Sequence, residues 1–401
     1  MTTKYKKYIE STLWSSGLLY IFFIINFIGQ VILARLLAPD DFGIIVLSLS
    51  IVEILKIFFG FSVSMAYIRM KDSSTLYGTA MFLGLLGWIG MIVSVLIFYY
   101  PISIIFGSNI AFFVLLISFF SIFVYLSYII EADLEKKFNF KKSSFIVGIS
   151  SFIGMFSAVI FAYYGYEEKS LLLREIISPI VLFYLSIKMT NKKISFDYNK
   201  KELKEMFLFV YKMLFSRGAE ILYMKFPLVL ISSLSGSTSL GLISQMLYLA
   251  QLPAVALGPI ATKVSYVFYS HHQDDKEIQN KGRNIISLLL LILSIPISFI
   301  FYFYSVELLL YLWGEKWIEA SPYLKQLAIF TLLYPVFTNL KTYLYSNAKN
   351  SIVTKSFLFG FTCLFLSIVF LSKEYLGVFF SVSMMLMLFY QIYVIRKMLV
   401  N

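Results

Sequence analysis

Twelve long apolar stretches follow one another along this chain of 401 residues. A helix that crosses the hydrocarbon core of a bilayer needs about 20 mostly apolar residues, whereas the strands of a membrane barrel alternate over about ten. The stretches in this chain are too long and too continuously apolar for such strands. The sequence therefore predicts an all-α integral membrane protein with about twelve transmembrane helices, at approximately 12–34, 42–66, 76–100, 109–130, 143–164, 170–189, 206–231, 238–262, 284–305, 321–345, 352–372 and 375–395.

Composition excludes the main soluble classes. Only 14% of the residues are charged and 59% are hydrophobic, which leaves too little charge to cover a soluble domain of this size. The net charge of +12 would suggest nucleic acid in a soluble protein, but basic residues collect in the cytoplasmic loops of membrane proteins. We therefore expect no nucleic-acid partner. The single cysteine, Cys363, excludes an intramolecular disulfide and a cysteine-based metal site.

The distribution of lysine and arginine predicts the orientation of the chain in the membrane. If the N-terminus lies inside, the inside segments carry 24 of these residues and the outside loops carry 4. Basic loops stay on the cytoplasmic side of a membrane protein. We therefore expect a multi-pass protein of the cytoplasmic membrane, with the N-terminus and the C-terminus both in the cytoplasm.

A central polar segment, residues 188–205, divides the expected helices six and six. The sequence thus predicts an N-terminal lobe at 1–200 and a C-terminal lobe at 201–401. The loops LLAPDDFG (36–43) and LSGSTSLG (234–241) are similar and occupy matching places, which favours two lobes in parallel orientation. Two-lobed membrane proteins of this kind are usually transporters. The alternative is two bundles with no passage between them.

Three stretches resemble a known family. They are ARLLAPDDFGIIVLSLSIVEILKIFFGFSVSMAYIRMKD (34–72), LPAVALGPIATKVSYVFYSHHQDD (252–275) and LLLYLWGEKWIEASPYLKQLAI (308–329). They resemble the Wzx-type polysaccharide flippases of the multidrug/oligosaccharidyl-lipid/polysaccharide exporter superfamily. The first stretch fits the family's loop and its basic-acidic pair at Ala34, Arg35, Leu37, Pro39, Phe42, Gly43, Gly60, Lys71 and Asp72.

The resemblance implies a V-shaped, exporter-type bundle of two six-helix lobes in a bacterial inner membrane. It implies that the substrate is a polyprenyl-pyrophosphate-linked oligosaccharide, moved between leaflets for O-antigen (lipopolysaccharide), capsule or exopolysaccharide assembly. Expected partners are that lipid-linked oligosaccharide, the bilayer, and the polysaccharide polymerase and chain-length machinery. Family members often carry an acidic residue midway along the seventh helix. Here Glu220 comes earlier and Lys225 stands near that place, so no coupling carboxylate is assigned.

Five charged residues inside the expected spans are the candidate substrate-binding residues. Charges in a membrane are costly, at roughly 2.5–3.5 kcal/mol each on insertion scales, and they usually face protein or a wet cavity. A pyrophosphate needs cationic partners, and the arginine fork suits phosphate. We expect a cationic central cavity lined by Arg217, Lys56 and Lys225, with Glu53 and Glu220 tuning these cations or relaying protons or sodium. The alternative is that Glu53–Lys56 and Arg217–Glu220 are salt bridges within single helices.

Two prolines in the eighth expected helix, Pro253 and Pro259, are hinge candidates for alternating access, because proline removes a helix hydrogen bond. A static kink is the alternative for both.

Signatures of catalytic, metal and nucleotide chemistry are missing from the sequence. It contains no Walker loop, no glycine-rich dinucleotide fingerprint and no HExxH. We therefore expect a transporter that is not an enzyme and has no cofactor and no metal. Two alternatives stay open, a cation-coupled small-molecule exporter of the same superfamily and a membrane polysaccharide polymerase. A polymerase usually has a large outer loop, and the longest expected here, 306–320, has about 15 residues.

Overall fold

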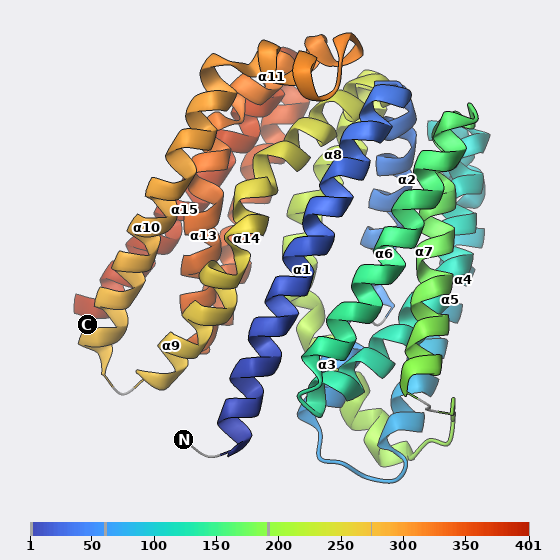
Figure 1. Ribbon diagram of the computed structural model, residues 1–401, viewed down its shortest axis with the longest axis vertical. Helices are drawn as coiled ribbons and strands as arrows, with labels where there is room; N and C mark the ends of the chain where they lie inside the picture. The colour runs from blue at the N-terminus through green and yellow to red at the C-terminus, as the bar shows by residue number, and fades with distance from the viewer. Residues whose placement is uncertain (1–2, 60–61, 191–192, 274, 401) are drawn as a thin grey trace. The chain divides into compact units, whose positions relative to one another are not determined.

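The structure is a computed structural model that describes residues 3–59, 62–190, 193–273 and 275–400. These residues form helices joined by turns and short loops, with no strand among them (Figure 1). Backbone groups in hydrocarbon must be paired within the protein, and a helix does this within one segment. The predicted all-α class is confirmed.

The chain divides into two compact units, Met1–Gly218 and Ala219–Asn401. The first unit contains seven helices and the start of an eighth: α1 (Thr3–Leu36), α2 (Pro39–Phe58), α3 (Val63–Arg69), α4 (Leu76–Phe106), α5 (Ser108–Lys136), α6 (Phe140–Tyr163), α7 (Glu167–Thr190) and the first part of α8 (Lys200–Ala256). The boundary between the units lies inside α8, at Gly218. It comes later in the chain than residue 200, where the polar segment predicts the division.

The second unit contains the rest of α8 and the C-terminal helices. Its elements after α8 are η1 (Pro259–Val264), α9 (Ser265–His271), α10 (Lys276–Phe303), α11 (Ser305–Leu312), η2 (Glu315–Ala320), α12 (Ser321–Gln326), α13 (Ala328–Ser346), α14 (Asn350–Phe370), η3 (Lys373–Tyr375) and α15 (Leu376–Val400).

Eight helices of the described residues are each long and apolar enough to cross a membrane, and the pair α2–α3, bent by 43°, would be a ninth. Helix α8 is counted as one of these eight. It has two arms, however, because Gly236 adopts a non-helical φ of 81° and breaks the helix there. The break falls inside the predicted loop 234–241. With the arms counted separately, and with α13 and the apolar part of α1 (Tyr20–Leu36) added, these residues supply about twelve crossings, as predicted.

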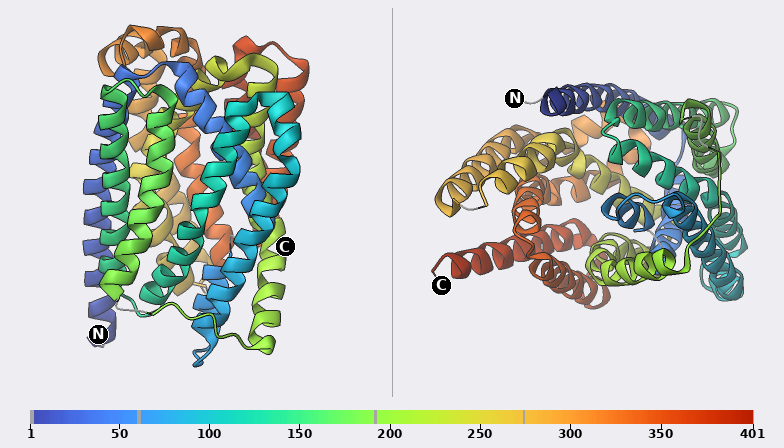
Figure 2. Two further views of the ribbon diagram at one scale, coloured as in Figure 1. Left: turned by 90° about the vertical axis from the view of Figure 1, so that its right-hand side faces the viewer. Right: turned by 90° about the horizontal axis from the view of Figure 1, so that it is seen from below.

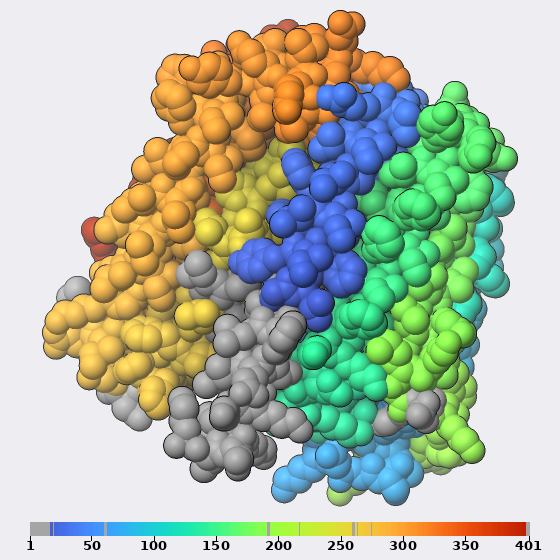
Figure 3. Space-filling model, viewed as in Figure 1, coloured from blue at the N-terminus to red at the C-terminus, as the bar shows by residue number. Residues whose placement is uncertain are grey.

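In the first unit, α1 packs along α6 (Figure 3). The side chain of Met155 fills the space in which a Cβ on Gly29 would lie, and Phe22 does the same at Gly148. A hydrogen bond of 3.1 Å from Ser151 Oγ to Asn26 Oδ1 joins the two helices between these contacts. Small residues thus permit close helix approach where hydrophobic burial gives little driving force.

The end of α2 rests against α4. A Cβ built on Gly87 would lie 2.2 Å from the backbone oxygen of Phe59, and one built on Gly90 would lie 2.6 Å from the Phe59 ring. A Cβ built on Gly84, one turn before Gly87, would lie 3.0 Å from the side chain of Ile129 of α5. The glycine face of α4 therefore receives both α5 and the point at which the second span bends.

A carboxylate clamp holds the first turn of α8 against the start of α4. Glu202 accepts hydrogen bonds from the hydroxyls of Ser73 at 2.5 Å, Thr75 at 3.0 Å and Thr79 at 3.0 Å. The Thr79 hydroxyl in turn accepts a hydrogen bond of 3.0 Å from the backbone of Asn199. These contacts tie the beginning of α8 to the first unit, to which the chain up to Gly218 belongs.

The connection between α7 and α8 crosses the end of α4 (Figure 2). The Tyr198 ring stacks on Phe82 with centroids 4.5 Å apart, and the Asp197 backbone occupies the space beside Gly78. The polar central segment is therefore packed onto the first unit at residues 197–199.

The contact at Gly87 leads to a test of packing. Gly87→Ala places a methyl group against the Phe59 carbonyl, and overpacking of this kind costs about 1–3 kcal/mol. We expect a lower melting temperature than wild type in detergent. Gly17→Ala is the matched control, because a Cβ there meets nothing within 4 Å and alanine favours helix by about 1 kcal/mol. Equal stability of the two variants would contradict this packing.

The clamp at Glu202 predicts a pH dependence of stability. Burial of the carboxylate raises its pKa. The hydrogen bonds from Ser73, Thr75 and Thr79 lower the pKa by more than burial raises it, so the pKa lies below the ordinary 4.5. A lowered folded-state pKa gives stability that is present above the unfolded pKa and is lost as the pH falls through the folded pKa. We expect Glu202→Gln to melt below wild type at pH 7, with the difference shrinking below pH 4.5. A difference that stays constant down to the lowest pH would argue against the clamp.

Candidate functional site

An open cleft of about 290 Å³ lies in the first unit between α3, α5 and the first arm of α8. We call it the α3–α5 cleft. Its lining contains an arginine, two glutamates, a tyrosine and a serine among apolar side chains: Ser64, Met65, Ile68, Tyr128, Glu131, Ala132, Glu135 and Arg217. Two of its elements, α5 and the first arm of α8, therefore bring charges of opposite sign to one space inside a bundle of apolar helices.

Glu131 is the residue of this cleft that sequence reasoning missed. Its Oε1 atom is buried and has no hydrogen-bond partner among the described residues. Glu135 follows one helical turn later on α5 and is exposed. A buried acceptor without a partner costs about 1–3 kcal/mol, and more when it is charged. The sequence signal for Glu131 was its position directly after the apolar stretch 109–130. A charge at that position resembles an ordinary charged residue at a helix end.

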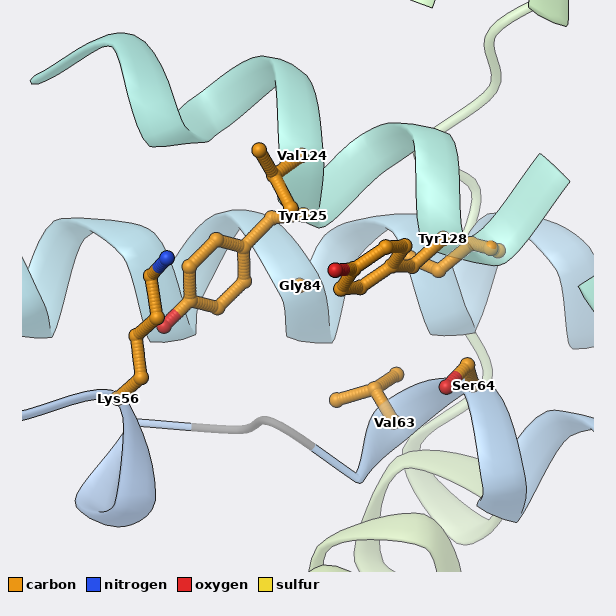
Figure 4. Close-up of a pocket in the computed structure, with 8 residues that line it drawn as sticks. Lys56, Val63, Ser64, Gly84, Val124, Tyr125 and Tyr128 are labelled. Carbon is orange, nitrogen blue, oxygen red and sulfur yellow. The ribbon is translucent and has the colours of Figure 1, made fainter. Parts of the chain in front are cut away.

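A second, smaller pocket adjoins the cleft and contains Lys56 (Figure 4). Its volume is about 20 Å³, which is room for one water molecule. It shares Ser64 and Tyr128 with the cleft. The close-up shows the Lys56 side chain of α2 alongside the Tyr125 ring, with Tyr128 one turn further along α5. Two of the predicted cations, Lys56 and Arg217, thus line adjoining cavities in the first unit.

Ion pairs and hydrogen bonds fix α3 against the end of α5. The Tyr67 hydroxyl donates to Asp133 Oδ1 at 2.8 Å, and Lys137 pairs with the same carboxylate at 2.9 Å. Lys136 pairs with Asp72 at 2.6 Å and donates to the backbone oxygen of Met70 at 2.7 Å. The acidic member of the Lys71–Asp72 motif thus has a structural role, because it holds one wall of the cleft in place.

The remaining predicted residues lie in both units. Glu53 is half-buried on α2 in the first unit. Glu220 and Lys225 are half-buried on α8 in the second unit. Glu220 pairs with Lys341 of α13 at 2.7 Å. From the sequence, Arg217 was the candidate partner of Glu220 within the same helix. The actual partner, Lys341, lies 121 residues further along the chain and was not predicted.

The hinge candidates lie near an irregular stretch of helix. Pro253 is buried in the second arm of α8, and Pro259 begins the π-helix η1. π-Helical turns are rare and often mark functional sites. The hinge role of both prolines stays a prediction.

Three carboxylates of the first unit lie close enough to hold a cation. Oxygen atoms of Asp41, Glu167 and Glu168 lie within 4.8 Å of one another. Hard cations such as Ca²⁺ prefer such ligands. Asp41 already accepts a hydrogen bond of 2.7 Å from the backbone of Ala38 and caps α2. The cluster therefore has a structural explanation in helix capping.

Sequence comparison relates the chain to polysaccharide biosynthesis proteins. The family described as polysaccharide biosynthesis protein matches residues 32–322. The succinoglycan biosynthesis transport protein ExoT of Rhizobium meliloti (strain 1021) is 23% identical over 311 residues, which cover 76% of this chain. The match spans 62% of the length of that relative.

Structural comparison agrees on the fold. Lipid II flippase MurJ in an inward closed conformation matches with a TM-score of 0.74 at 14% identity, covering 97% of this chain and 87% of that chain. An inward-facing multidrug resistance transporter of the MATE family, in the MOP superfamily, matches with a TM-score of 0.69 at 10% identity, covering 94% of each. At these identities the likeness establishes a shared fold, and it confirms the predicted exporter fold class.

The ion pair of Glu220 and Lys341 leads to a stability test. Lys341→Met leaves the half-buried Glu220 carboxylate without its lysine, and we expect a loss of about 1–3 kcal/mol. Adding Glu220→Gln removes the unpaired charge and should restore much of that loss, which a double-mutant cycle measures as coupling. Lys355→Met, at an exposed lysine of α14, is the control and should leave stability unchanged. Additive effects of the two substitutions would exclude a stabilising pair.

Proposed function

The chain belongs to the polysaccharide biosynthesis protein family, and we propose on that premise that it flips polyprenyl-pyrophosphate-linked oligosaccharide repeat units across the cytoplasmic membrane of a bacterium. The product is material for a surface polysaccharide, whether exopolysaccharide, capsule or O-antigen. Two similar proteins, a succinoglycan biosynthesis transport protein and a lipid II flippase, support this proposal. In this proposal the protein is a transporter, and its partners are the polysaccharide polymerase and the chain-length machinery.

The observation that carries the proposal is Arg217 in the α3–α5 cleft, with Lys56 in the adjoining pocket. Arginine binds phosphate through two parallel charge-assisted hydrogen bonds, and a lysine adds a point charge. We propose that these two cations contact the pyrophosphate and that Lys225 is a further contact. Glu53 and Glu220 modulate the cations, and Pro253 and Pro259 supply bending during alternating access.

The proposed orientation puts both termini in the cytoplasm, as the excess of basic residues in the inside segments indicates. With that orientation α3 and the end of α5 belong to the cytoplasmic half of the membrane. The α3–α5 cleft then lies on the side where lipid-linked repeat units are made. In this proposal Arg217 receives the pyrophosphate first.

Replacement of Arg217 tests the proposal. A hydrogen bond to a charged group contributes about 1.5–3 kcal/mol, so its loss should slow transport about tenfold or more. The host is a strain that lacks its own flippase and is complemented by this chain. Surface polysaccharide should fall in Arg217→Ala, and lipid-linked repeat units should accumulate in the membrane.

The matched control is Lys212→Ala, which removes an exposed cation from the same arm of α8. Lys212 lies nearer the expected membrane surface and should leave export unchanged. Both variants must reach wild-type amounts in the membrane. Normal export by Arg217→Ala at a normal amount of protein would refute its role. Drug resistance conferred by the wild-type chain, without any polysaccharide export, would favour the small-molecule exporter.

A further inference from the structure

An apolar groove of about 300 Å³ lies in the second unit, away from all the charges discussed above. Helices α10, α12, α13 and α15 form it. The eight residues that line it are Tyr302, Lys325, Gln326, Ile329, Val378, Ser381, Val382 and Met385. Of these eight, Lys325 alone carries a charge.

The other polar groups of the groove are used within the protein. Gln326 donates to the backbone oxygen of Glu374 at 2.8 Å and accepts from the backbone of Gly377 at 3.1 Å. The Ser381 hydroxyl donates to the backbone oxygen of Gln326 at 2.7 Å. These bonds join α12 to α15 and leave the groove wall apolar. The Lys325 ammonium lies over the Tyr302 ring, 5.0 Å from its centroid.

The charge and the apolar wall lie at different depths. Tyr302 is next to the end of α10, Lys325 is in the last turn of α12, and Val378 is in the first turn of α15. Met385 follows Val378 by seven residues, which is about 10 Å along a helix. The cation is therefore at the end of the helices, and the apolar wall extends from it toward the middle of the span.

The groove is open to its surroundings. Ile329 and Val382 are 52% and 41% exposed, and Tyr302 is 48% exposed. In a membrane protein, exposed apolar side chains on spanning helices face lipid. A tyrosine at a helix end is typical of the membrane–water interface. Along the groove the cation comes first, then the aromatic ring, then the apolar wall. A lipid molecule has the matching sequence of groups, a charged headgroup followed by an apolar chain.

We propose that this groove binds an anionic phospholipid of the surrounding bilayer. Its phosphate pairs with Lys325, and one acyl chain lies along Ile329, Val382 and Met385. A single cation matches a single negative charge, whereas a pyrophosphate needs several cationic partners. The bound lipid joins α10, α12 and α15 at one end of the second unit. This proposal requires only that the chain spans a membrane, so it does not depend on the transported substrate.

Native mass spectrometry of the purified full chain tests the proposal. The probes are phosphatidylglycerol and phosphatidylcholine with the same acyl chains. Wild type should retain phosphatidylglycerol in preference to phosphatidylcholine. Lys325→Ala should bind phosphatidylglycerol about fivefold more weakly, as expected for one lysine facing an anionic lipid. Lys355→Ala, at an exposed lysine of α14, should bind as wild type does.

A second variant tests the apolar wall without touching the charge. Val382→Trp fills the groove and should reduce the retention of both lipids. Melting temperatures without added lipid verify that each variant is folded, and phosphatidylglycerol should raise that of wild type more than that of Lys325→Ala. Unchanged phosphatidylglycerol binding by folded Lys325→Ala would overturn the proposal. Displacement of phosphatidylglycerol by an equal amount of polyprenyl pyrophosphate would overturn the choice of occupant.

Discussion

The cost of an unpaired polar group in hydrocarbon is the constraint on which this structure depends. An isolated charge at mid-membrane costs several kcal/mol, and so does each backbone group without a hydrogen bond. Helices satisfy the backbone within one segment, which is why most of the described chain is helical. Side-chain charges then need partners from other helices. Those partners decide which helices pack together, as the contacts of Glu202 and Lys341 with distant segments illustrate.

The same constraint separates what the sequence could predict from what it could not. Apolar length predicted the helices, and the loop around Gly236 was visible because glycine and serine interrupt that length. Side-chain partners were less accessible, because a helix can present its charge to any neighbour. Lys341 thus became the partner of Glu220 although Arg217 was nearer in sequence. Glu131 was overlooked because a carboxylate at the end of an apolar stretch usually faces water.

The bend between α2 and α3 also depended on information beyond local sequence. The apolar stretch 42–66 predicts one continuous helix, whereas the structure has two, at an angle of 43°. The glycine face of α4 accommodates the end of α2 there, with the Phe59 backbone against Gly87. Those glycines permit close approach, but the sequence does not say which helix uses them. Because α3 starts beyond the bend, its serine and apolar side chains reach the cleft that also contains Arg217.

Opposite charges in the α3–α5 cleft suit a protein that must release what it binds. An arginine alone in a low-dielectric site would hold a pyrophosphate tightly, because little water competes for it. In the proposed function, the exposed Glu135 of the same cleft repels an incoming anion and lowers its affinity for Arg217. Passage across a membrane requires binding that is favourable enough for entry and weak enough for exit. The charge of Glu135 therefore has a rationale in the proposed function, because it limits the strength of a site whose ligand has to move on.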